Sequence, residues 1–138
     1  DLHAALGISQ LQRLDPILAT RTAIAARYDV LLADLPVTVP ALLSDRSSAW
    51  HLYVVELGQA VTRSRAEVFT AMRTAGVGVA VHYIPVHLQP YYRALGGQPG
   101  QYPCAEAYYQ RCITLPLYPG LDPAKQDQVV RALAGALT

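Results

Sequence analysis

The stretch from residue 49 to residue 83 constrains the fold most, because its apolar pattern changes from strand-like to helix-like and back. The segment "AWHLYVVEL" (49–57) is rich in aromatic and β-branched residues, which predicts a buried strand. A helical pattern follows over 64–76, and "VGVAVHY" (77–83) predicts a second strand. A chain with this order of elements packs helices on a small sheet, so the expected fold class is α+β.

The helix within this stretch carries signals at both of its ends. Ser64 and Glu67 fit a capping box, in which each side chain accepts a hydrogen bond from the other residue's backbone amide. Gly76 suits the position just after the last helical residue. Val68 and Met72, four residues apart, predict the face that the helix buries.

Further elements complete a small antiparallel or mixed sheet with helices on it. The segment "LPVTVP" (35–40) has a proline at each end, which predicts an edge strand. "PCAEAYYQR" (103–111) predicts a short helix that begins at its proline, and "CITLPL" (112–117) predicts another strand. Asp122 and Pro123 are typical of a helix start and are expected to begin the last helix.

Residues 1–34 are predicted to form helices that link the α+β part, residues 35–138, to another domain. The opening "DLHAALGISQLQRL" has leucines at near-helical spacing but no capping residue before them. We therefore expect Asp1 to lie inside a helix of a longer protein. Asp15 and Pro16 are expected to restart the helix, as its N-cap and its first residue.

The charge content of the chain limits its partners. Charged residues make up 15% of the chain, below the ~25% of an ordinary domain, so part of the surface is expected to face another domain or subunit. The formal net charge is +1 and the basic residues form no run, which argues against a nucleic-acid partner. No apolar stretch approaches the ~20 residues needed to span a membrane, so no membrane partner is expected.

The cysteines and the lysine exclude two further kinds of chemistry. Cys104 and Cys112 would lie ~12 Å apart on one helix, too far for a disulfide. Two unpaired thiols are typical of a cytoplasmic protein. Lys125, the only lysine, falls in the first turn of the last helix and is expected to be solvated. The chain therefore has no candidate for a buried amine that forms a Schiff base.

The segment "VHYIPVHLQPYYR" (81–93) combines two histidines, three tyrosines and two prolines. His82 and His87, joined by His51, are possible metal ligands, but no acidic residue or cysteine lies close to them in the sequence. A catalytic histidine would need partners, and the chain has neither a nucleophile elbow nor a Gly-rich phosphate loop. Two interpretations stay open on the residues alone. The segment is either a proline-braced loop that binds a polyhydroxylated or phosphorylated ligand, or a set of rings that packs against the sheet.

Four stretches of the chain resemble the DegT/DnrJ/EryC1/StrS family of sugar aminotransferases, in the right order and over nearly all 138 residues. They are "DLHAALGISQLQRLDPILATRTAIAARYDVLL", "SAWHLYVVEL", "GVGVAVHYIPVHLQPYYRALGG" and "YPCAEAYYQRCITLPLYPGL". The form "VHYIPVHLQPYYR" is especially similar to the branch of the family that serves pseudaminic acid synthesis.

The resemblance implies that the chain is the C-terminal small domain of a fold type I aminotransferase dependent on pyridoxal phosphate. In that family a lysine of the N-terminal domain holds the cofactor. Glutamate gives its amino group, which passes to the C4 keto carbon of a UDP-linked 4-keto-6-deoxy sugar. The enzymes are homodimers with active sites near the subunit interface. The N-terminal cofactor-binding domain is not among these residues, so we expect the chain alone to bind no cofactor and to be inactive.

The resemblance also selects the residues expected to contact the nucleotide sugar, with no catalytic residue and no metal ligand among them: His82, Tyr83, His87 and Tyr91. Trp50 and His51 match the family pattern too, and we expect them to be structural because they fall in the predicted buried strand. His3 is expected at the surface or at a domain interface. Two other functions are kept as alternatives: a free-standing ligand-sensing module of α+β type, and an RNA-binding domain, which the scattered basic residues disfavour.

Overall fold

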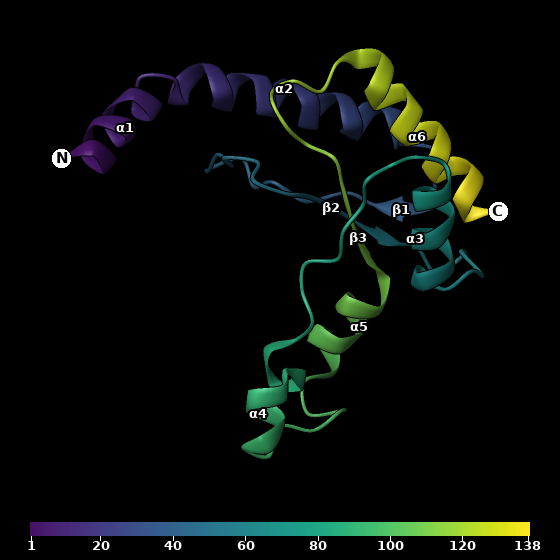
Figure 1. Cartoon of the computed structure of the whole chain (residues 1–138). Coiled ribbons are helices and arrows are strands. Elements are labelled where there is room, and N and C mark those ends of the chain that lie inside the picture. The colour runs from purple at the N-terminus through teal and green to yellow at the C-terminus, as the bar shows by residue number, and fades with distance from the viewer.

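The computed structural model describes residues 1–138 and contains three strands and six α-helices (Figure 1). One short 3-10 helix, η1, precedes α4. In chain order the elements are α1 (Leu2–Leu11), α2 (Leu14–Leu31), β1 (Val37–Thr38), β2 (Tyr53–Leu57), α3 (Arg65–Thr74), η1 (Val86–Leu88), α4 (Pro90–Ala94), α5 (Pro103–Arg111), β3 (Cys112–Leu115) and α6 (Pro123–Leu137).

The three strands form one antiparallel sheet in the order β1-β2-β3, which confirms the α+β class. β1 is the edge strand predicted over 35–40, although only two of its residues pair. β2 is the central strand, and its side chains alternate between buried and half-buried. The predicted strand over 49–57 is correct only from Tyr53 onward, because Trp50 adopts a positive φ of 47° that no strand contains.

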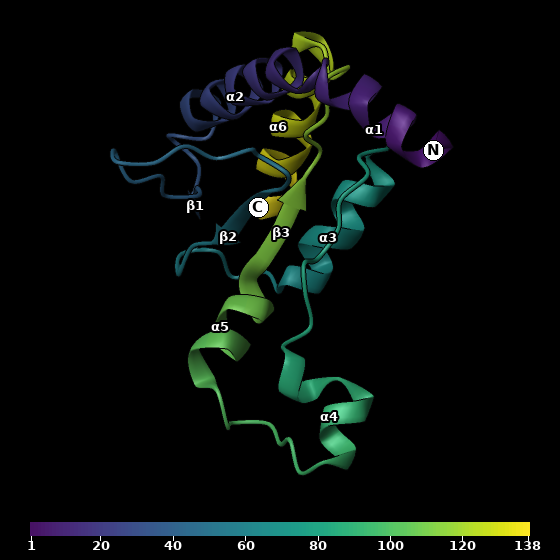
Figure 2. The ribbon, with the colours of Figure 1, turned by 90° about the vertical axis from the view of Figure 1, so that its left-hand side faces the viewer.

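The predicted strand over 77–83 is wrong. This segment pairs with β3 only at a single bridge between Ala80 and Thr114. The alternation of apolar residues in this segment does predict burial correctly, since Val77 and Val79 are buried. The pairing fails because the chain leaves the sheet after Ala80 and continues away from it (Figure 2). The sequence pattern of a strand records packing on one face, and it does not record whether a neighbouring strand is available.

Capping residues in the sequence correctly predict most of the helix ends discussed above. The capping box of Ser64 and Glu67 is present at the start of α3, and Gly76 follows the helix with a φ of 78°. The Asp122 side chain accepts a hydrogen bond from an amide in the first turn of α6, as predicted. Asp15, however, is not an N-cap. Arg13 keeps a right-handed conformation, so α2 already begins at Leu14 and Asp15 lies in its first turn.

The core lies between the sheet and helices α2, α3 and α6, and two fully buried tyrosines stand at its centre. The rings of Tyr28 and Tyr53 lie 4.9 Å apart, and each hydroxyl donates a hydrogen bond, to the carbonyl of Pro116 and to Asp29 respectively. Burial raises the pKa of both hydroxyls, so both stay protonated donors. Trp50 packs on Tyr53 as the structural role predicts.

The structure also tests several predictions about single side chains. His51 is exposed, so the expectation that it lies in a buried strand is wrong. His3 is exposed on α1, as expected. Cys104 is exposed and Cys112 is buried, and both are free thiols. None of the helices has both the length and the hydropathy that a membrane span requires.

Helix α1 extends beyond the sheet and contributes no buried side chain (Figure 1). Leucines and an isoleucine that would ordinarily be covered are exposed along it and at the start of α2: Leu2, Leu6, Ile8, Leu11 and Leu14. The helices predicted over 1–34 are present as α1 and α2, and their role as a link to another domain stays a prediction. Only α2 packs on the α+β core, through Ile24, Ala25 and Tyr28.

Residues 81–102, here called the arm, project from the end of the sheet opposite α2 and α6 (Figure 2). The arm contains η1 and α4 and returns to the sheet through α5. The expected proline-braced loop is thus partly helical, because Pro85 precedes η1 and Pro90 is the first residue of α4. All four residues predicted to bind the sugar lie on the arm.

Candidate functional site

His82 lies where the arm leaves the sheet, and the sheet fixes its ring. Its Nδ1 atom is 2.8 Å from the hydroxyl oxygen of Thr114 on β3. The bridge between Ala80 and Thr114 brings the two segments together, with backbone hydrogen bonds in both directions. The ring also meets Tyr83 edge-on at 4.6 Å between centroids. One ring nitrogen is therefore engaged, and the other has no partner in the protein.

Tyr83 and Tyr91 present their rings to solvent. They are 66% and 70% exposed, respectively, which is unusual for rings of this size. Tyr91 also meets the ring of Tyr92 edge-on at 5.3 Å. Two exposed phenols with rotatable hydroxyls can stack on a flat ligand and can donate or accept hydrogen bonds.

His87 is nearly buried, and it holds the arm together. Its Nε2 atom is 2.9 Å from a carboxylate oxygen of Glu106 on α5, and the two side chains are 10% and 16% exposed. Its ring packs edge-on against Tyr102 at 4.8 Å. Gly97 has to be a glycine here, because a side chain at this position would collide with the backbone carbonyl oxygen of His87.

Glu106 collects hydrogen bonds from three parts of the arm. Besides His87, it accepts from the amide of Gly100 at 2.8 Å and from that of Tyr102 at 3.3 Å. The amide of Gly100 and then the His87 ring hold the pKa of this carboxyl below its ordinary value. The ionised carboxylate thus ties η1, the turn before α5 and α5 itself into one unit, here called the Glu106 clasp.

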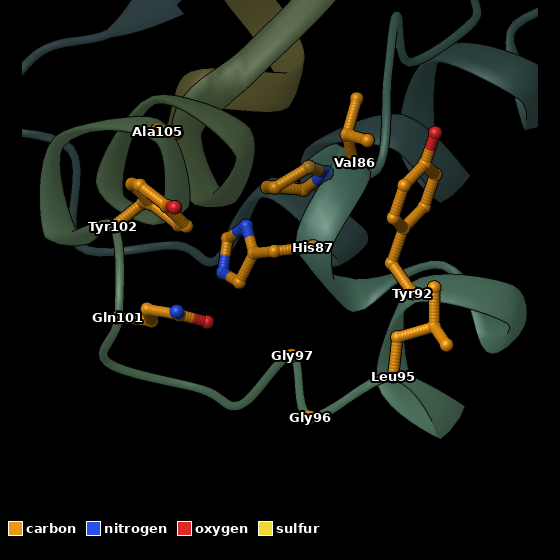
Figure 3. Close-up of a pocket in the computed structure, with 10 residues that line it drawn as sticks. Val86, His87, Tyr92, Leu95, Gly96, Gly97, Gln101, Tyr102 and Ala105 are labelled. Carbon is orange, nitrogen blue, oxygen red and sulfur yellow. The ribbon is translucent and has the colours of Figure 1, made fainter.

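Beside this clasp lies a cavity of about 590 Å³, a size typical of small-molecule sites. Figure 3 shows His87 pointing across it toward Tyr102 and Gln101, with Tyr92 of α4 and Leu95, the residue after α4, on the other side. Half of its ten lining residues are hydrophobic, and the polar groups come from the side chains of His87 and Gln101 and from the hydroxyls of its tyrosines. Such a lining suits a ring that carries hydroxyl groups.

The four predicted residues therefore fall into two groups. His82 and Tyr83 lie beside β3, whereas His87 and Tyr91 lie farther along the arm, and only His87 lines the cavity. Sequence reasoning missed Gln101 and Tyr102 as lining residues and Glu106 as the group that organises them. An acidic residue in the first turn of the predicted helix 103–111 was the available signal, since such a side chain can reach back to amides before the helix.

Neither a metal site nor a complete pyridoxal phosphate site is formed by the side chains of this chain. The structure contains no group of three or more His, Cys, Asp or Glu side chains placed to hold a metal ion. Lys125 is exposed and pairs with Asp122 at 3.3 Å, so the one lysine does not fit the role of the amine that holds the cofactor.

Comparison with known proteins gives one consistent result. The family model described as the DegT/DnrJ/EryC1/StrS aminotransferase family matches residues 1–134. The chain is 40% identical over 139 aligned positions to the spore coat polysaccharide biosynthesis protein SpsC of Bacillus subtilis (strain 168), covering 96% of this chain and 35% of that protein. The chain thus spans about a third of the length of this relative.

Several solved structures share the fold, including two aminotransferases. Spr1654 from Streptococcus pneumoniae, named as a sugar aminotransferase, superposes with a TM-score of 0.90 at 30% identity, over 97% of this chain and 34% of that one. Helicobacter pylori PseC, an aminotransferase involved in the biosynthesis of pseudoaminic acid, gives a TM-score of 0.86 at 25% identity, over 96% and 36%. These matches do not single out the pseudaminic acid branch. They do establish that the chain belongs to the DegT/DnrJ/EryC1/StrS aminotransferase family.

Proposed function

We propose that this chain is the C-terminal small domain of a sugar aminotransferase that depends on pyridoxal phosphate. The observation that carries the proposal is the family match over residues 1–134, in a chain about a third as long as its relatives. Spr1654 has been solved in forms with pyridoxal phosphate and with its aminated counterpart, which supports the same cofactor in the parent protein. The family match also favours this function over a free-standing ligand-sensing module.

The cofactor would be held by residues outside this chain, because Lys125 is exposed and ion-paired. We therefore assign the chain a share in substrate binding and no chemical step, and we expect these 138 residues alone to be inactive. In the parent protein, glutamate would donate the amino group and the C4 keto carbon of a nucleotide-linked 4-keto-6-deoxy sugar would accept it. The parent is proposed to be a cytoplasmic homodimer that binds no nucleic acid.

The sugar-nucleotide class is supported by what the relatives do. SpsC serves spore coat polysaccharide biosynthesis, and PseC serves pseudoaminic acid biosynthesis. We accordingly propose a role in making a surface polysaccharide or glycan, with a UDP-linked sugar of the pseudaminic acid type as the first substrate to test.

The arm is proposed to supply one wall of the sugar-nucleotide pocket. Tyr83 and Tyr91 have the exposed rings that stacking on a base or sugar needs. His82 offers the ring nitrogen that Thr114 leaves free. His87 is proposed to act from inside the arm, by lining the cavity while Glu106 holds its Nε2 atom.

Steady-state kinetics of the full-length parent tests this function. The assay follows amino transfer from glutamate to a UDP-4-keto-6-deoxy sugar, with the visible absorbance of the bound cofactor as a second signal. His82→Ala should raise the KM for the sugar much more than the KM for glutamate. His3→Ala, on exposed α1, is the matched control and should change neither. No amino transfer to any such sugar would reject the function, whereas unchanged sugar kinetics in His82→Ala would reject only the role of the arm.

A further inference from the structure

A second cavity, of about 440 Å³, lies at the other end of α5, where the end of β2 and the start of α3 meet the last turn of α5. Arg63, Arg65 and Arg111 line it, and no acidic residue does. It shares no lining residue with the cavity beside the Glu106 clasp. The nine residues of α5 separate the two sites by roughly 13 Å along the helix axis.

The guanidinium groups around this cavity carry many N–H donors, and few acceptors of the protein face them. The side chain of Arg65 makes no hydrogen bond in the structure, and its guanidinium lies 5.0 Å from the centre of the Tyr109 ring. The Nε atoms of Arg65 and Arg111 are both buried without a hydrogen-bond partner. Buried donors in folded proteins nearly always have an acceptor, so two such atoms beside one cavity indicate that an acceptor is missing.

The positions of these arginines are nevertheless fixed by the fold. Arg63 donates to the carbonyl oxygen of Ala136 at the end of α6, at 2.9 Å. Arg111 pairs with Glu56 of β2 at 3.1 Å through one terminal nitrogen. Tyr109 supports Arg65 by stacking. Glu56 offsets the charge of Arg111, and Glu67 lies near enough to Arg63 for their charges to interact, so Arg65 supplies the positive charge that has no ion-pair partner.

The capping box satisfies two backbone amides at the start of α3. The Glu67 carboxylate accepts from the amide of Ser64, and the Ser64 hydroxyl accepts from the amide of Glu67. The Glu67 carboxylate accepts hydrogen bonds from the amide and the hydroxyl of Ser64, which lines the cavity, and the nearby Arg63 charge helps these bonds to lower the pKa of this carboxyl. What remains is the set of arginine forks, whose planar array of N–H donors matches the oxygens of a phosphoryl group.

We propose that this cavity binds the phosphoryl group of a small molecule, with Arg65 and Arg111 as the principal donors and Arg63 as a third. The volume exceeds that needed for a single phosphate, so a diphosphate fits the class as well. The anion would accept hydrogen bonds from the terminal nitrogens of Arg65, which have no acceptor in the structure. The site does not depend on the proposed amino transfer, because it lies outside the arm and uses none of the arm's residues.

Isothermal titration calorimetry on the full-length protein tests the site, with inorganic phosphate and pyrophosphate as probes. Ionic strength is held constant with sodium chloride, and saturating pyridoxal phosphate keeps any cofactor phosphate site occupied. We expect pyrophosphate to bind more tightly than phosphate. Arg65→Gln should weaken pyrophosphate at least about tenfold, in line with the loss of a charge-assisted hydrogen bond.

Two further variants make the result specific. Arg65→Lys keeps the charge and the fold but loses the fork, so it should bind with intermediate affinity. Arg73→Gln removes an exposed arginine at the opposite end of α3 and should bind pyrophosphate as the unaltered protein does. Equal affinity of Arg65→Gln and Arg73→Gln would overturn the proposal, and so would acetate binding as tightly as phosphate or no binding of either probe.

Discussion

Replacing Thr114 with valine removes the hydroxyl that holds the His82 ring while leaving its surroundings in place. Valine has nearly the shape of threonine, and residue 114 is buried in β3. The backbone of the segment should stay where it is, because Ala80 and Thr114 exchange hydrogen bonds of 2.8 and 3.3 Å through their main chains. The substitution therefore tests the orientation of one imidazole and little else.

The size of the effect follows from one hydrogen bond of 2.8 Å. A neutral hydrogen bond contributes about 1 kcal/mol net, and the half-buried His82 can recover part of this from water once Thr114 is gone. A free energy of about 1 kcal/mol corresponds to roughly a fivefold change in the population of the anchored ring. A ligand that requires the anchored ring binds with an apparent affinity proportional to the fraction of protein in which the ring is anchored. The KM for the sugar should therefore rise up to about fivefold.

Steady-state kinetics of the full-length Thr114→Val variant checks this, with the sugar and glutamate varied in turn. Thr38→Val is the matched control, since Thr38 is an exposed strand residue whose hydroxyl has no partner in the structure. The sugar KM should rise only in Thr114→Val, with the glutamate KM unchanged. An unchanged sugar KM would show that the orientation of His82 does not matter, and an equal rise in both KM values would point to general loosening of the domain.

Two further predictions concern the clasp and the core. Glu106→Gln should weaken the clasp, so the amides of Gly100 and Tyr102 should exchange with deuterium several-fold faster. Because the folded pKa of Glu106 is lowered, the clasp of the unaltered protein should also loosen as the pH falls below the ordinary glutamate range. The measurement is the exchange rate of the same amides, corrected for the intrinsic pH dependence of exchange. Gln126→Leu, which removes a buried donor to a carbonyl of α2 at 2.8 Å, should cost about 1–3 kcal/mol in urea unfolding, while exposed Gln128→Leu should cost almost nothing.

The parts of the fold that could be predicted from sequence are those set by neighbouring residues. The capping box at Ser64 and the helix starts at Pro103 and Asp122 depend on hydrogen bonds within one turn, so the local sequence contains the whole signal. The strand predicted over 77–83 is wrong because pairing depends on a distant strand, and only Ala80 forms a backbone bridge to β3. Burial of its valines was visible in the pattern, but its departure from the sheet was not.

The sequence indicates the location of the candidate site better than it indicates the roles of the residues there. The predicted histidines and tyrosines all lie on the arm, and one of them, His87, lines its cavity. The sequence could not show that His87 points inward to Glu106, since these residues are 19 positions apart and meet only after α5 returns to the sheet. Nor could it show the second cavity, whose arginines come from the start of α3 and the end of α5.

The uncovered apolar side chains of α1 have a practical consequence for work on these 138 residues alone. Leu2, Leu6 and Leu11 lie on a helix with no buried residue. Folding of the α+β core therefore leaves a row of apolar side chains exposed to water. Such a row favours self-association that grows with protein concentration. Light scattering and sedimentation of the isolated chain would then report self-association through α1 and not the dimer proposed for the parent protein.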